Sequence, residues 1–140
     1  MTKTDVMAKL EYFNMVHGVT LRAIGALSDK DLEFRPLPAM RTPRELVFHI
    51  YTQEKVLAEG VRQGRFTNEE ANRSVPEMEG AAVELKALRS VEDVRAYADA
   101  CHQAAHKIFA AMSDEDLTRS VESPFGAYPG WRFLDRKSVV

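Results

Sequence analysis

Apolar residues recur at three- and four-residue steps in three long segments of the chain, which are separated by polar stretches containing proline and glycine. This spacing predicts α-helices over residues 5–27, 43–64 and 91–112, because it places the apolar side chains along one face of a helix. Each predicted helix therefore has a face to bury. The recurring residues are Val6, Leu10, Phe13, Leu21 and Ile24 in the first segment, Leu46, Val47, Ile50, Leu57, Ala58 and Val61 in the second, and Val94, Tyr97, Ala98, Cys101, Ala105, Ile108 and Met112 in the third.

Capping residues mark the start of the second and third helices. Thr42 is placed as an N-cap, Pro43 occupies the first helical position, and Glu45 completes a capping box. Ser90 and Asp93 repeat the same spacing before the third helix. These local signals fix where both helices begin.

Two glycines, Gly18 and Gly25, lie inside the first predicted helix. Each weakens a helix by about 1 kcal/mol relative to alanine. We therefore expect packing against other helices to support this segment, with the glycines at close helix contacts.

A long connection, residues 65–89, joins the second and third helices and contains Pro76 and Gly80. Such a connection allows two successive helices to run parallel rather than antiparallel. The third helix is followed by a short turn that Ser113 caps.

The C-terminal part of the chain is predicted to hold little regular structure. Prolines and glycines interrupt it before one last helical turn at residues 131–134. Strand signals are weak, and apart from residues 138–140, which can pair at an edge, no strand is expected. The chain is thus predicted to be one all-α domain, residues 1–140, built as a bundle of three long helices with a short or truncated fourth.

Composition and charge narrow the possible functions. The net charge of −2 over 140 residues provides no basic field for nucleic acid or an anionic membrane. Cys101 is the only cysteine, which excludes an intrachain disulfide and a thiolate metal cluster, and its place in the apolar stripe favours an inert buried thiol. The charged N-terminus resembles neither a signal peptide nor a membrane span, so a cytoplasmic location is expected.

The four histidines, His17, His49, His102 and His106, are the candidates for chemistry, because helix bundles build metal sites from inward side chains on facing helices. His102 and His106 have the i, i+4 spacing that places two imidazoles on one helix face, although a solvated surface pair is the more common reading. His17 lies within the stripe of its helix, where a hydrogen-bonded core histidine is the alternative to a ligand.

His49 lies at the edge of the second helix's stripe, and Glu54 places a carboxylate within that stripe. If the first two helices are antiparallel, His17 and His49 are at similar distances from their connection and can meet. A catalytic zinc needs about three protein ligands and an open position. The four histidines can supply these ligands, with Glu54 or Gln53 as a base or as a hydrogen-bonding partner of the ligands.

Two segments of the chain resemble the DinB-like family of metal-dependent four-helix-bundle proteins. They are LRAIGALSDKDLEFRPLPAMRTPRELVFHIYTQE, where a Ser-Asp turn precedes an Arg-Pro segment and a Thr-Pro helix cap, and AAMSDEDLTRSVESPFG. The similarity spans most of residues 10–134. It implies a DinB-like bundle in which His49 and an HxxxH pair on the fourth helix bind a divalent metal.

By this resemblance, the fourth helix begins near Pro129 and its histidines would fall beyond Val140. Three interpretations follow: a truncated chain without metal, a site that uses His17, His102 or His106 instead, or a bundle completed by a partner chain. An open bundle exposes an apolar groove, so a homodimer is expected.

Two functions are therefore open. The first is a metal-dependent hydrolase or thiol-dependent transferase that acts on a small-molecule or thiol substrate, with zinc, nickel or iron held by histidines and His49 as the main ligand. The alternative is a non-catalytic helical protein that dimerises or binds a ligand and has lost the metal site. Neither nucleic acid nor a membrane is an expected partner.

Overall fold

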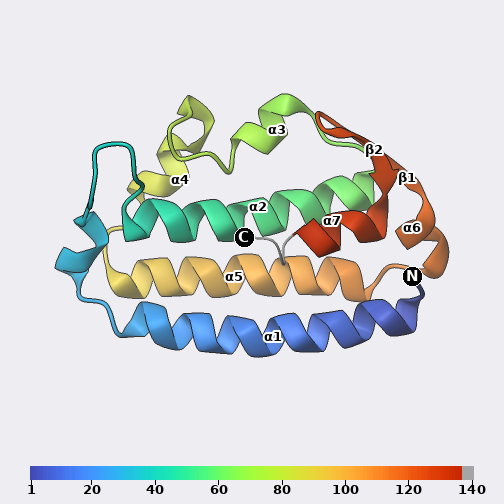
Figure 1. The fold of residues 1–140 in the computed structure, drawn as a ribbon, viewed down its shortest axis with the longest axis horizontal. Helices are drawn as coiled ribbons and strands as arrows, with labels where there is room; N and C mark the ends of the chain where they lie inside the picture. Colours follow the sequence, from blue (N-terminus) through green and yellow to red (C-terminus); the bar gives the residue numbers. More distant parts are fainter. Residues whose placement is uncertain (137–140) are drawn as a thin grey trace.

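Three long helices form the body of the protein in the computed structural model, which describes residues 1–136. They are α1 (Lys3–Gly25), α2 (Pro43–Gln63) and α5 (Val91–Ala110). Helix α5 lies between the other two, runs parallel to α2 and is antiparallel to α1 (Figure 1). The predicted helix positions are confirmed to within two residues at each end.

The capping boxes predicted for α2 and α5 are both present. Thr42 accepts a hydrogen bond from the backbone of Glu45, whose carboxylate in turn accepts from the backbone of Thr42. Ser90 and Asp93 make the same reciprocal pair. Helix α2 ends at Gly64, whose φ of +87° is the left-handed conformation that favours glycine at a helix C-terminus.

Short helices occupy the connections between the long ones. A 3-10 turn, η1 (Asp29–Glu33), follows α1. The crossover contains α3 (Asn68–Asn72), η2 (Glu79–Ala81) and α4 (Ala82–Lys86), and it passes along one side of α2 (Figure 1). Because this crossover returns the chain to the starting end of α2, it is what allows α2 and α5 to run parallel, as predicted.

The C-terminal part corrects one prediction, because it contains a β-hairpin where no sheet was expected. After α6 (Asp114–Thr118), strands β1 (Ser120–Ser123) and β2 (Gly126–Pro129) pair antiparallel. Each strand has only four residues, too few to show an alternating pattern in the sequence. The backbone of Glu122 also exchanges hydrogen bonds with Gly64 and Phe66, which fixes the hairpin to the end of α2. The predicted pairing of residues 138–140 lies outside the described residues.

A short fourth helix, α7 (Gly130–Arg136), follows the hairpin and packs against α2, so the all-α class and the short last helix are confirmed. Its residues Phe133 and Leu134 are buried. Within residues 1–136, no helix combines the length and the apolar character needed to cross a membrane.

The buried apolar residues form two separate clusters rather than one continuous core. The first includes Val6, Leu10, Phe13, Leu57, Val61, Ala105, Phe109 and Phe133. The second includes Ile24, Leu32, Phe48, Tyr51, Val94, Ala98 and Cys101. Between the two, in sequence along α1, α2 and α5, come His17, Glu54 and His102, which are also buried. We call these three residues the polar layer.

Candidate functional site

The rings of His17 and His102 stack at the centre of the bundle. Their centroids are 3.9 Å apart and their planes differ by 19°. Both side chains are buried, so the expectation that His102 is a solvated surface residue is wrong. Helix α5 packs against both α1 and α2, so the edge of its apolar stripe that carries His102 is also covered.

His17 connects all three long helices through its two ring nitrogens. Its Nε2 lies 2.9 Å from Oδ1 of Asp99 on α5 and its Nδ1 lies 2.8 Å from the hydroxyl of Tyr51 on α2. A carboxylate only accepts hydrogen bonds, so in the neutral ring Nε2 donates to Asp99 and Nδ1 accepts from Tyr51. Burial lowers the pKa of His17, against the effect of Asp99, and burial raises the pKa of Tyr51 to about 12.

His102 also has a protein partner at each ring nitrogen. Nδ1 donates to Oε1 of Glu54 at 2.9 Å, and Nε2 lies 3.2 Å from the side-chain oxygen of Asn14. The Glu54 carboxylate is thus buried beside an imidazole, which offsets part of its desolvation cost. The sequence had singled out Glu54 as a carboxylate within an apolar stripe, and the structure gives it this partner.

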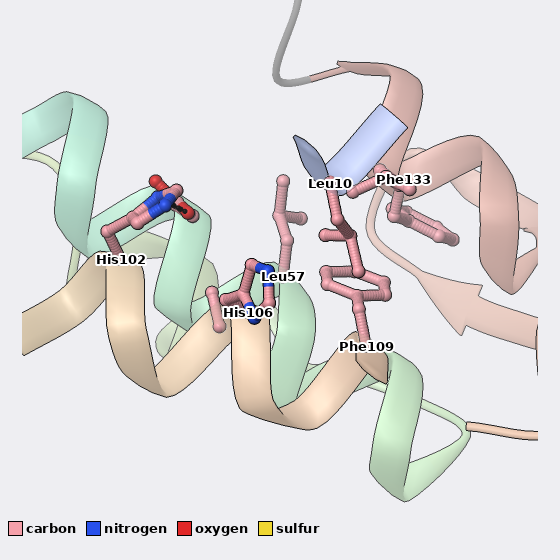
Figure 2. Close-up of a pocket in the computed structure, with 9 residues that line it drawn as sticks. Leu10, Leu57, His102, His106, Phe109 and Phe133 are labelled. Atoms are coloured by element: carbon pink, nitrogen blue, oxygen red, sulfur yellow. Dashed lines mark hydrogen bonds and ion pairs between the residues drawn. The ribbon is translucent and has the colours of Figure 1, made fainter. Parts of the chain in front are cut away.

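His106 follows His102 by one turn and is half-buried. Figure 2 shows the two histidines on successive turns of α5, with Leu10, Leu57 and Phe133 gathered near His106. Their ring centroids are 6.2 Å apart. The HxxxH pair therefore shares a helix face, as predicted, but His102 points to Glu54 and His106 lies against an apolar pocket.

The polar layer does not have the arrangement of a metal centre. A metal binds the in-plane lone pair of an imidazole nitrogen. All four nitrogens of His17 and His102 face protein partners, and the stacked rings do not aim them at a common point. Among residues 1–136, no three His, Cys, Asp or Glu side chains come together as a metal-binding group.

His49 lies on another face of α2, away from the polar layer. Residues 49 and 51 are separated by about 200° around a helix, so Tyr51 reaches His17 while His49 faces the crossover. The expectation that His17 and His49 meet is therefore not fulfilled. The Nδ1 atom of His49 donates a hydrogen bond of 2.7 Å to the carbonyl oxygen of Ser74.

This contact sets the tautomer of His49. A carbonyl only accepts, so Nδ1 carries the proton and Nε2 keeps its lone pair. Histidines that bind metals commonly donate their other nitrogen to a backbone carbonyl in this way. His49 therefore fits the role of one metal ligand, whereas His17 and His102 do not, and whether the protein binds a metal remains a prediction.

His49 lines a pocket of about 240 Å³ between α2, α3 and the tip of the hairpin. Its other polar lining residues are Gln53, Asn68, Asn72 and Ser74. The apolar part of the wall includes Val56, Leu57, Phe66, Val75 and Phe125. A few polar groups in a mostly apolar concave surface are typical of small-molecule sites.

The sequence did not identify several residues of these two regions. Tyr51, Asp99 and Asn14 complete the polar layer's hydrogen bonds. Asp99 and Asn14 lie three residues before His102 and His17, which is a weak signal of a shared helix face, whereas nothing in the sequence pointed to Tyr51. Asn68 and Asn72 come from the crossover, for which no regular element was expected.

Comparison with known proteins adds one match. The family model described as the DinB superfamily matches residues 12–138, which is most of the chain. No protein among the curated sequences matches it.

Proposed function

The chain belongs to the DinB superfamily, and from this premise we propose that it is a metal-dependent enzyme acting on a small molecule, as a hydrolase or a thiol-dependent transferase. We place its reaction at the pocket lined by His49. The observation that carries the proposal is the imidazole of His49, oriented by the Ser74 carbonyl and lining a pocket of small-molecule size.

Different residues of the pocket would have different roles in such a reaction. When bound at His49, with its remaining ligands supplied from outside this pocket, a zinc, nickel or iron ion would supply Lewis-acid activation of a water or thiol nucleophile. The Ser74 carbonyl holds the imidazole in the tautomer that presents Nε2 as a ligand. The amide side chains of Gln53, Asn68 and Asn72 can orient a substrate, and Phe66 with Phe125 can cover its apolar part.

The test is the metal-to-protein ratio of the purified chain, measured by elemental analysis. We expect about one ion per chain or per dimer in the wild type. The ratio should fall close to zero in His49→Ala, with helicity by circular dichroism unchanged. His106→Ala is the matched control, since His106 lies outside the His49 pocket, and it should keep the metal.

Stoichiometric metal in His49→Ala would refute the assignment of His49 as ligand. Added zinc or nickel provides a second readout. An ion that binds only the folded state raises the melting temperature, so the rise should occur in the wild type and be absent from His49→Ala.

The alternative function is a non-catalytic dimerising or ligand-binding protein. It is favoured by the hydrogen bonds that occupy both nitrogens of His17 and of His102, and by exposed apolar residues on the outer face of α1. A folded wild type with a metal ratio close to zero would select this alternative.

A further inference from the structure

The His49 pocket contains no residue with a permanent charge. None of its lining residues is Asp, Glu, Lys or Arg, although these types make up 29% of the chain. A larger surface depression between α2 and α5 shows the contrast, because Glu59, Arg62, Lys107, Asp116 and Arg119 all line it. The wall of the His49 pocket thus differs in chemistry from the surface around it.

Glu77, whose carboxyl group interacts electrostatically with His49, is already paired with a cation. Arg41 holds Glu77 through two contacts of 2.9 and 3.1 Å. This pairing lowers the pKa of Glu77, and His49 contributes to a smaller extent. Glu77 is therefore matched by Arg41 and does not present an unpaired charge to a ligand.

The polar groups that do line the pocket are neutral donors and acceptors. The side-chain amides of Gln53, Asn68 and Asn72 each offer both an N–H and a carbonyl oxygen. In the described part of the chain, none of the three amides is bonded to another protein group, while the hydroxyl of Ser74 donates to the carbonyl of Ala71. The amides are thus available to a ligand.

We propose that the His49 pocket selects uncharged ligands that combine an amide or hydroxyl group with an aromatic or aliphatic part. The amides of Gln53, Asn68 and Asn72 pair with the ligand's polar group, and Phe66 and Phe125 contact its apolar part. The side chains of the wall give a charged ligand no opposite charge in return for its lost hydration, which is unfavourable. This inference rests on the proposed function for the location of the site and names its substrate class.

Three probes of the same shape separate the effect of charge: benzamide is neutral, benzoate is an anion and benzamidinium is a cation. Binding is followed by titration of the full-length chain, using the NMR signals of the side-chain amides of Gln53, Asn68 and Asn72. The buffer contains EDTA, so that no metal attracts benzoate, and is held at about pH 8, where histidine is mostly neutral.

The expected result is that benzamide shifts these signals and binds at least about tenfold more tightly than either charged probe. Equal or tighter binding of benzoate or benzamidinium would overturn the proposal, and so would the absence of shifts with all three probes. Because metal is excluded, this outcome is independent of the metal ratio that tests the proposed function.

A pair of variants tests the preference for uncharged ligands by changing the charge of the protein instead of that of the probe. Asn72→Asp places a carboxylate in the pocket wall and should move the preference to benzamidinium by about tenfold. Gln63→Glu adds the same charge at the end of α2, outside the pocket, and should leave the preference for benzamide unchanged. An Asn72→Asp protein that still prefers benzamide to the same extent would overturn the proposal.

Discussion

The polar layer divides the apolar core into two clusters, and its cost depends on its hydrogen bonds. A buried polar group without a partner costs about 1–3 kcal/mol. The imidazole nitrogens of His17 and His102 avoid this cost because Tyr51, Asp99, Glu54 and Asn14 meet them. These hydrogen bonds join residues of α1, α2 and α5. They therefore fix how each of the three helices is rotated about its own axis relative to the other two.

The first prediction concerns the pH dependence of stability through His17. Burial lowers its pKa in the folded protein, whereas an unfolded histidine titrates at about 6.5. The unfolded chain then binds this proton more readily, so the free energy of unfolding should fall as the pH decreases through about 6.5. Urea unfolding between about pH 7.5 and 5.5 measures this change.

His17→Gln is the comparison for this experiment, and it should show a smaller pH slope than the wild type. Asp99 does not interfere, because its hydrogen bond from His17 lowers a carboxyl pKa that already lies below this range. An unfolding free energy that rises on acidification, or an equal slope in His17→Gln, would contradict the assignment to His17.

The burial of a single residue could be predicted from its position in a helix, whereas its contacts with other helices could not. Glu54 was singled out as a carboxylate within an apolar stripe that could act as a base or hydrogen-bond a histidine ligand, and Cys101 was predicted as a buried thiol, which it is. The identity of the partner was not predictable. Whether Glu54 meets His102 on α5 or His17 on α1 depends on the rotation of α2 about its own axis in the bundle, and periodicity alone leaves that rotation open.

Among the elements, the long helices were predictable and the hairpin was not. Helices α2 and α5 carry capping boxes within four residues of sequence, so their starts are specified locally. Strands β1 and β2 depend instead on tertiary contacts, including the bonds from Glu122 to the end of α2. The predicted close contacts at Gly18 and Gly25 are wrong, because no atom beyond the adjoining residues and the backbone of α1 itself lies within 4 Å of a methyl group placed at either position.

This correction gives a prediction at the level of helices, in which the same substitution has opposite effects at two glycines. Gly18→Ala should raise the free energy of unfolding by about 0.5–1 kcal/mol, since alanine is favoured over glycine inside a helix and its methyl group meets no other atom here. Gly64→Ala should lower it by about 1 kcal/mol, because φ at the end of α2 is +87°.

Chemical denaturation of both variants beside the wild type provides the measurement. The atoms of Arg119 lie 3.7 Å from a methyl group at Gly64, so a steric clash does not explain the expected loss. If Gly18→Ala destabilised the protein, the open space around that position would be in doubt.

At the scale of the whole molecule, α1 is apolar on two sides. Val6, Leu10, Phe13 and His17 face the core, while an outer stripe remains in solvent. That stripe consists of Tyr12, Met15, Val16 and Val19, which are 57%, 61%, 40% and 52% exposed. Their i, i+3, i+4 and i+7 spacing is the pattern of a helix face that packs against another helix.

We expect this outer stripe to form the interface of a homodimer, a partner that the sequence had suggested for the open bundle. A two-fold axis would bring two copies of α1 together through the same residues. Light scattering should then give twice the chain mass of 15.8 kDa for the wild type. Met15→Lys places a charge in the centre of the stripe and should give the mass of one chain.

Val83→Lys is the matched control, because Val83 on α4 is 83% exposed and lies outside α1. It should keep the dimer mass, which separates loss of the interface from a general effect of added charge. A wild type with the mass of one chain would refute the dimer. A dimer that persists in Met15→Lys would move the interface elsewhere, and the apolar stripe of α1 would then need another partner.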